Sequence, residues 1–333
     1  MYELLGISLV LASLLTINAF ASAIVAACWR FCDSLRGCSA SARAEVLFAL
    51  RAGPPMLALI SVTLFLVPSY VGYEPYTTTE TVSKKLAALA IVSALGVMLA
   101  LWRALRSWFA TRKLLQEWLS SAVQIKLSGT NIPAFRIVNK FPIIAVVGTI
   151  RPRLFVAEHV LNTLSQEELS AAIAHEGGHL RAHDNFKRSL LRACRDALMI
   201  VPCGRSLDRA WAEAAECAAD EQAAQENPET ALNLASALVK IAKLVPVGSH
   251  LAIPMAAFLV GAEETRGVKA RVGRLLEIAS KGHLRRDLNP AISRIVPTAS
   301  FCGLLLFAFM VASNSSVQVT VHNVIERVVQ ILS

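Results

Sequence analysis

The sequence predicts a mainly α-helical membrane protein, with four transmembrane helices and an α+β domain between the third and the fourth. Three observations lead to this prediction. Of the 333 residues, 55% are hydrophobic and only 17% are charged, which is unusual for a soluble protein. Four long runs lack charged side chains, and about 20 apolar residues suffice to cross the hydrocarbon core as a helix. Between the last two runs, short β-branched stretches give way to helical patterns.

The predicted domains follow from these runs. Residues 1–112 hold three transmembrane helices, 113–290 form the mixed domain, and 291–333 hold the fourth helix and a short external tail. The four spans cover about residues 4–28, 54–73, 86–104 and 295–313. The first run is alternatively a cleaved signal peptide, because Ala21-Ser22-Ala23 resembles a processing site. The uncharged start "MYELLG" and the length of the run favour a retained anchor.

Arginine and lysine predict the orientation, because they accumulate in cytoplasmic loops. They flank the inner ends of the predicted spans at Arg30, Arg36, Arg43, Arg51, Arg103, Arg106, Arg112, Lys113, Arg285, Arg286 and Arg294. The pattern predicts a multi-pass protein of the inner (cytoplasmic) membrane, with its N-terminus outside and residues 113–290 in the cytoplasm. The net charge of +9 is then explained by juxtamembrane residues facing anionic lipid. Nucleic acid is not an expected partner, since basic and aromatic residues do not interleave.

The seven cysteines do not indicate a disulfide framework. Those of the predicted cytoplasmic domain should stay reduced. Cys28, Cys32 and Cys38 cluster near the inner end of the first span, where we expect free thiols. A metal-binding or redox role for the three is the alternative, although their spacing fits no common zinc module.

The mixed domain begins with a predicted small sheet. Residues 134–156, "AFRIVNKFPIIAVVGTIRPRLFV", contain short β-branched runs separated by proline and glycine. A helix start follows, because Ser165 and Glu168 have the spacing of a capping box. The strand at 143–148 is either an edge strand, able to dock an extended substrate through Ala145, Val146, Val147 and Gly148, or an interior strand.

The helix after Ser165 carries the motif "HEGGH", with His175 and His179 one turn apart and Glu176 beside them. At this spacing the two side chains point within roughly 40° of each other, so their imidazoles can share one metal ion. Packing alone is the alternative reason for two histidines on an amphipathic helix. Gly177 and Gly178 each cost the helix about 1 kcal/mol relative to alanine, but would let another helix or a substrate backbone approach closely.

A metal site of this kind needs a third protein ligand. Residues 209–224, "RAWAEAAECAADEQAA", predict a helix that presents Glu216 and Asp220 one turn apart. Its small alanines would let it pack closely against the histidine helix, whereas a solvated acidic face is the alternative. Glu213 and His183 compete with Glu216 for the role of third ligand.

The stretches "SQEELSAAIAHEGGHLRAHDNF" and "EAAECAADE" resemble the gluzincin zinc metallopeptidases of families M56 and M48. In those families HExxH is followed by an Asp five residues after the second His, and by E-x-x-x-D on a later helix. The matching positions are His175, Glu176, His179, Asp184, Glu216 and Asp220. Three spans before the motif and one after it resemble M56, which includes antibiotic-response receptors, with M48 as second choice. The S-x-x-K motif of the receptors' sensor domain is absent.

The resemblance implies an α+β gluzincin-type peptidase domain with one Zn²⁺ per chain, held by His175, His179 and Glu216. Glu176 would be the general base, and Asp220 would orient a ligating imidazole. The group that stabilises the oxyanion stays open among His250, Arg271 and Arg274.

The function implied is a membrane-anchored zinc endopeptidase that cuts a cytoplasmic or membrane protein, such as a cytoplasmic repressor in signalling or regulation. Its partners would be the lipid bilayer and a protein or peptide substrate. Quality control of misfolded membrane proteins, or signal transduction by a non-catalytic protease fold, are the alternatives. The sequence gives no indication of an oligomeric state.

Overall fold

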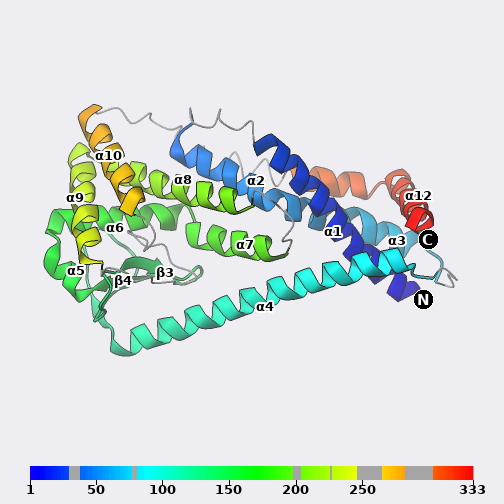
Figure 1. Cartoon of the computed structure of the whole chain (residues 1–333), viewed down its shortest axis with the longest axis horizontal. Helices are drawn as coiled ribbons and strands as arrows, with labels where there is room; N and C mark the ends of the chain where they lie inside the picture. Colours follow the sequence, from blue (N-terminus) through cyan, green and yellow to red (C-terminus); the bar gives the residue numbers. More distant parts are fainter. Residues whose placement is uncertain are drawn as a thin grey trace.

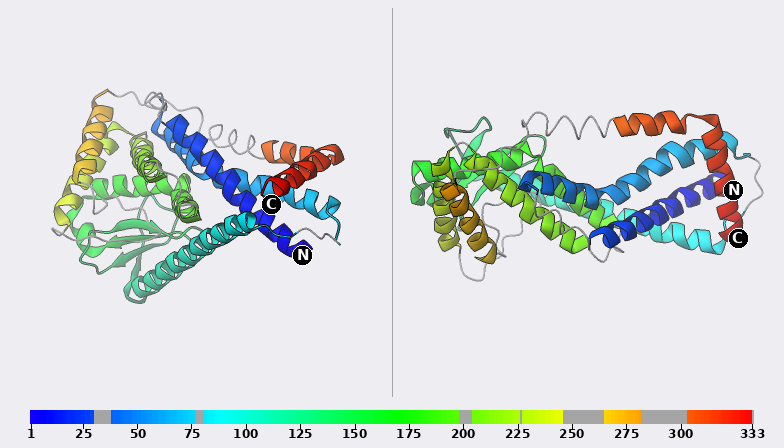
Figure 2. Two further views of the ribbon diagram at one scale, coloured as in Figure 1. Left: turned by 45° about the vertical axis from the view of Figure 1, so that its right-hand side comes forward. Right: turned by 90° about the horizontal axis from the view of Figure 1, so that it is seen from above.

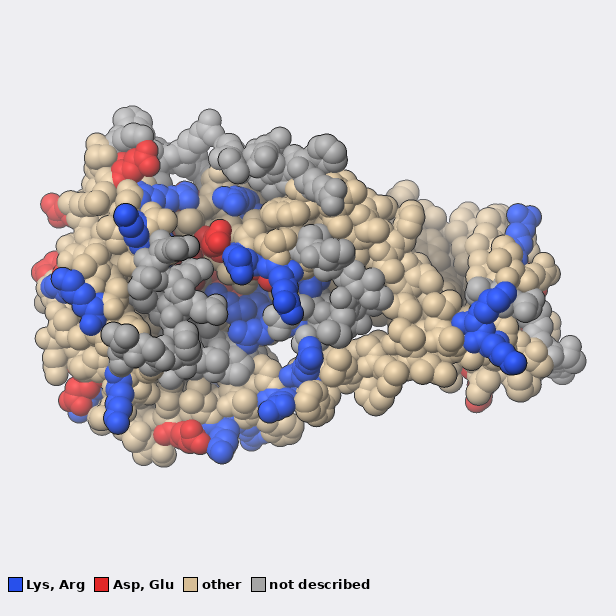
Figure 3. Space-filling view, viewed as in Figure 1, with Lys and Arg blue, Asp and Glu red and all other residues tan. Residues whose placement is uncertain are grey.

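The computed structural model describes residues 1–29, 38–76, 81–197, 204–225, 227–245, 265–281 and 303–332. The molecule is elongated (Figure 1). Apolar helices and both chain termini lie at one end, and a helical domain with a small sheet lies at the other. On the face shown in Figure 3, charged side chains gather towards both ends, and the surface between them is largely uncharged. Such an uncharged band is what a bilayer-spanning segment requires.

Three helices among the described residues are long and apolar enough to cross a membrane: α1 (Tyr2–Trp29), the continuous helix Ala40–Tyr73, and α4 (Lys84–Ser121). The second consists of α2 (Ala40–Ser61), a π-helical turn η2 (Val62–Leu66) and α3 (Val67–Tyr73). Each contains one of the first three predicted spans. The second and third have 34 and 38 residues, well beyond the roughly 20 that a bilayer needs.

The fourth predicted span, 295–313, is only partly described. Gly303–Ala312 is helical and is followed by α12 (Ser315–Leu332) after a bend of 77°. Within the described part of the chain, the helix count therefore reaches four spans only if this bent pair crosses as one unit. Where the sequence suggested a short tail, the chain forms a helix that lies across the end of the apolar bundle (Figure 2). Ile325 of α12 is buried there with Leu5 and Leu86.

A four-stranded sheet forms between residues 123 and 157, which confirms the predicted small sheet. It contains β1 (Val123–Ile125), β2 (Ala134–Ile137), β3 (Ile144–Val147) and β4 (Arg153–Ala157). The strand order is β1-β2-β4-β3, with β2 and β4 parallel and the other two pairs antiparallel. β3 is therefore an edge strand.

Helices follow the sheet along the chain: α5 (Glu158–Thr163), α6 (Gln166–Arg181), α7 (Asp184–Ala197), α8 (Gly204–Ala224), α9 (Pro228–Leu244) and α10 (Thr265–Lys281). α6 begins with the predicted capping box, in which the Ser165 hydroxyl accepts the Glu168 N–H and the Glu168 carboxylate accepts the Ser165 N–H. The core is continuous with α4, because Trp118 packs edge-on against the fully buried Phe155 at 5.2 Å.

The first half of α2 packs against the domain that contains the sheet. Arg51 is only 5% exposed, and its Nε lies 3.0 Å from Asp208 of α8. Glu45 pairs with Lys187 of α7. The segment before the second span and this domain therefore lie in contact with each other. This paired arginine also explains how α2 can begin 14 residues before the predicted span.

Candidate metal centre and active site

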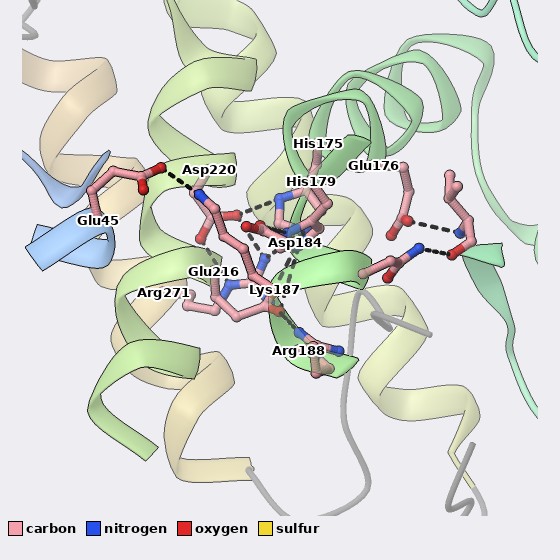
Figure 4. Close-up of polar contacts among 12 residues, drawn as sticks. Glu45, His175, Glu176, His179, Asp184, Lys187, Arg188, Glu216, Asp220 and Arg271 are labelled. Carbon is pink, nitrogen blue, oxygen red and sulfur yellow. Dashed lines mark hydrogen bonds and ion pairs between the residues drawn. The ribbon is translucent and has the colours of Figure 1, made fainter. Parts of the chain in front are cut away.

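The residues predicted to hold a metal converge between α6 and α8 (Figure 4). The Nε2 atoms of His175 and His179 lie 3.2 Å apart. The carboxylate of Glu216 faces both, with its oxygens 3.6 Å from His175 Nε2 and 3.5 Å from His179 Nε2. One donor atom from each of the three residues lies within 4.8 Å of the others. We call His175, His179 and Glu216 the α6–α8 cluster.

Two aspartates support the imidazoles from behind. His179 Nδ1 is hydrogen-bonded to Asp184 Oδ2 at 2.7 Å, and His175 Nδ1 lies 2.9 Å from Asp220 Oδ1. The second contact is close but is not directed as a hydrogen bond. A carboxylate at Nδ1 leaves the Nε2 lone pair facing the cluster, the arrangement that metal-ligating histidines require. Asp220 thus lies where the resemblance places it, and Asp184 has the same relation to His179.

The electrostatics of the cluster suit a bound cation. Burial acts to lower the pKa of His179, but the carboxylates of Glu216 and Asp184 outweigh it and raise that pKa to about 10. Burial acts to raise the pKa of Glu216, but His179 and Arg271 hold it well below its ordinary value. Positive charge is therefore strongly favoured between the imidazoles and the carboxylate. Two imidazole nitrogens and one carboxylate oxygen are a donor set that zinc takes in peptidase sites, so these residues fit Zn²⁺.

Arg271 of α10 closes the cluster on one side. Its guanidinium lies 2.6 Å from Asp220 Oδ1, 3.1 Å from Glu216 Oε2 and 3.5 Å from His175 Nε2. Of the three residues considered for stabilising the oxyanion, Arg271 alone is seen next to the donor atoms of the α6–α8 cluster. Arg274 instead pairs with Glu221, and His250 lies outside the described residues.

Glu176 faces away from the two histidines towards β3. Its Oε2 accepts a hydrogen bond from the Val146 N–H at 3.0 Å, whereas its buried Oε1 has no hydrogen-bond partner among the described residues. Burial raises the pKa of Glu176, against the lowering influence of His179 and His175. One carboxylate oxygen is thus fixed by the sheet, and the other is left to accept a proton.

The two glycines of the motif have different surroundings. A Cβ on Gly178 would lie 3.0 Å from the Cα of Ala219, so the absence of a side chain lets α8 approach α6. A Cβ on Gly177 would meet nothing within 4 Å. Gly178 thus admits a neighbouring helix, as anticipated from the sequence, whereas Gly177 borders a cavity.

That cavity has a volume of about 230 Å³ and lies between α6 and the sheet. Its apolar walls include Ile132, Val146, Leu154, Ile173 and Leu180, with Glu176 at its side. An apolar space of this kind next to a candidate general base can receive an apolar side chain of a substrate.

The sequence did not reveal a role for Asn185, the first-turn neighbour of Asp184. Its side-chain N–H₂ group donates to the carbonyl of Val146 at 2.9 Å, and lies 3.4 Å from that of Gly148. Together Glu176 and Asn185 therefore occupy both backbone groups of Val146 that face away from β4. No local pattern could indicate this contact, because its partner lies 39 residues earlier.

The competing candidates lie elsewhere. Glu213 is exposed on α8. His183 is exposed where α6 ends, with a left-handed φ of 56°. Cys28 and Cys38 are exposed free thiols, and Cys32 lies outside the described residues.

The family model described as peptidase family M48 matches residues 112–244. The matched segment runs from the end of α4 to α9 and contains every residue of the α6–α8 cluster. None of the curated proteins compared with the chain matches it. The match supports assignment to a zinc metallopeptidase family. It falls on M48, the second choice from the sequence, and M56 is not shown.

Proposed function

We propose that this protein is a membrane-anchored zinc endopeptidase in which His175, His179 and Glu216 hold one zinc ion and Glu176 is the general base. The observation that carries the proposal is the convergence of three buried or half-buried donors beside a carboxylate with one unpartnered oxygen. The M48 match over the same residues supports it.

The chain's own groups account for the proton movements of peptide hydrolysis. When bound, Zn²⁺ supplies Lewis acidity, which makes a water molecule more acidic and polarises the scissile carbonyl. Glu176 Oε1 accepts a proton from the attacking water and later delivers it to the leaving amine. The Val146 N–H holds the other oxygen of Glu176 at 3.0 Å, which fixes the direction of the base. Arg271 keeps Asp220 and Glu216 in place.

The substrate is proposed to lie along β3, at Ala145, Val146, Val147 and Gly148, with one side chain in the apolar cavity. The sheet order supports this, because β3 is an edge strand. The backbone N–H and carbonyl of Val146 are already hydrogen-bonded to Glu176 and Asn185. A substrate strand added at this edge would therefore replace at least the Asn185 contact with a hydrogen bond of its own.

The proposed substrate is a cytoplasmic or membrane protein, and the domain of residues 113–290 is proposed to face the cytoplasm. The uncharged band of the apolar helices supports a membrane location. Reporters fused after residue 120 or 280 should behave as cytoplasmic, and one fused at residue 78 as external. External labelling of the 120–280 segment would overturn this topology.

The assignment of roles is tested by removing the base and a ligand separately. Glu176→Gln should keep zinc in the α6–α8 cluster and lose cleavage of an unfolded protein by about 100-fold or more. Glu216→Ala should lower zinc content by one ion per chain and abolish cleavage with it. The matched control is Glu213→Ala on the same helix, which should keep both. Cleavage that survives Glu176→Gln would show that Glu176 is not the base, whereas a protein that binds zinc and never cleaves would favour a non-catalytic role.

A further inference from the structure

The helices α3 and α12 meet at the far end of the apolar helices (Figure 1). A second group of side chains of the types that ligate metals lies at their contact. Donor atoms of Glu74, His322 and Glu326 lie within 4.8 Å of one another. Glu74 directly follows α3, and the other two face it from α12. We call these residues the α3–α12 cluster.

The spacing on α12 puts two donors on one face. His322 and Glu326 are one turn apart, and His322 Nε2 lies 3.9 Å from Glu326 Oε1. This distance is too long for a hydrogen bond but leaves room for an ion between the two groups. The same i, i+4 relation brings His175 and His179 together on α6.

The three donors are largely removed from water. Glu74 is only 6% exposed, and the side chains of His322 and Glu326 are 17% and 33% exposed. Two carboxylates brought this close, and partly removed from water, repel each other. His322 Nδ1 is also buried, without a hydrogen-bond partner among the described residues. A divalent cation would offset the charge of both carboxylates.

Neighbouring contacts fix α12 in the position that the cluster needs. The Ser69 hydroxyl donates to the carbonyl of Gln318 at 2.6 Å. The rings of Tyr73 and His322 lie 6.0 Å apart, and Ile325 is buried in the apolar bundle. The donors thus come from two helices that are already packed against each other, so little ordering is needed to bind an ion.

We propose that Glu74, His322 and Glu326 bind one divalent transition-metal cation of the Zn²⁺ type, which links α12 to α3. One imidazole with two carboxylates favours such an ion over Mg²⁺ or Ca²⁺, which prefer oxygen-only ligands. The partial exposure of His322 and Glu326 leaves the remaining coordination positions to water. The site is separate from the α6–α8 cluster and does not depend on peptidase activity.

The test uses full-length protein in detergent, with zinc counted after equilibration and removal of free metal. In a His175→Ala/His179→Ala background, about one zinc per chain should remain, and adding His322→Ala should remove it. Asn323→Ala, an exposed neighbour on α12, is the matched control and should keep the ion. Absence of zinc in the background, or zinc that persists after His322→Ala, overturns the proposal.

A second variant covers the case in which His322→Ala fails to fold. Glu326→Gln keeps the shape of a half-exposed side chain and removes one charged ligand, so affinity for zinc should fall roughly tenfold or more. Unchanged affinity overturns the proposal. The failures of the two proposals are distinguishable. If the bound zinc is lost with His322→Ala but not with His175→Ala/His179→Ala, the result refutes the zinc site of the proposed peptidase and supports this one.

Discussion

The α6–α8 and α3–α12 clusters use the same residue types but differ in how the imidazoles are supported. His175 and His179 are 0% and 3% exposed, and a carboxylate faces the rear nitrogen of each. His322 is more exposed, and its rear nitrogen has no hydrogen-bond partner among the described residues. Rear carboxylates fix the orientation and basicity of a ligand. We infer that the first cluster is built to hold an ion in one defined geometry and the second to link two helices.

The largest effect should come from replacing the aspartates that face the Nδ1 atoms of the two histidines. Asp184→Asn keeps the size of the side chain but weakens its pull on the His179 Nδ1–H, so zinc affinity at the α6–α8 cluster should fall about 10- to 100-fold. Asp220→Asn should act similarly through His175. Chelator competition measures both, and zinc at the α3–α12 cluster should not change.

Glu213→Gln, which removes an exposed carboxylate of α8, is the matched control for this comparison. If it lowers zinc affinity as much as Asp184→Asn does, then the total negative charge near the cluster governs binding, and not the contact of a carboxylate with the imidazole Nδ1. The contrast between the two clusters would then have no bearing on their roles.

A smaller effect tests how closely the two helices of the first cluster must pack. Gly178→Ala would push α8 away at Ala219, which lies one turn from Glu216, and should cost about 1–3 kcal/mol of stability together with part of the zinc affinity. Gly177→Ala has open space around it and should instead stabilise α6 by up to about 1 kcal/mol. Denaturant unfolding and zinc titration distinguish them, and equal behaviour of the two variants would contradict the packing argument.

The parts of this site that the sequence predicted depend on local spacing. The capping box at Ser165, the single helix carrying His175 and His179, and the short strands of residues 134–156 all follow from patterns within a few residues. Glu216 was found because the helix that carries it is alanine-rich and resembles a known second motif.

The parts that could not be predicted depend on tertiary contacts. Arg271 meets Asp220 across 51 positions of the chain, and His322 meets Glu74 only because α12 turns back across the bundle. The helix that contains the second span begins earlier than the predicted span for a related reason. Arg51 ended the uncharged run, although its charge is paired with Asp208 inside the fold, so the helix starts well before it.

The smallest effect concerns the contact between α9 and the start of α6, the helix that carries the two histidines of the α6–α8 cluster. Glu168 accepts hydrogen bonds from Ser236 at 2.6 Å and from Lys240 at 2.8 Å. Burial acts to raise the pKa of Glu168, but Lys240, Ser236 and the Ser165 N–H together lower it. Because its pKa is lower in the folded state, the pairing stabilises the fold above the ordinary glutamate pKa of about 4.3. This contribution is lost as pH falls through the lowered value.

Lys240→Gln should therefore cost about 1 kcal/mol or less at neutral pH, since the lysine is 41% exposed and solvent screens the pair. The cost should vanish at a pH low enough to protonate Glu168. Lys243→Gln removes an exposed charge near the end of the same helix and should show a smaller effect that does not change in this pH range. Denaturant unfolding of both variants at neutral and acidic pH makes the comparison. A Lys240 cost that is equal at both pH values would mean that packing of the lysine stem, and not its charge, joins α9 to α6.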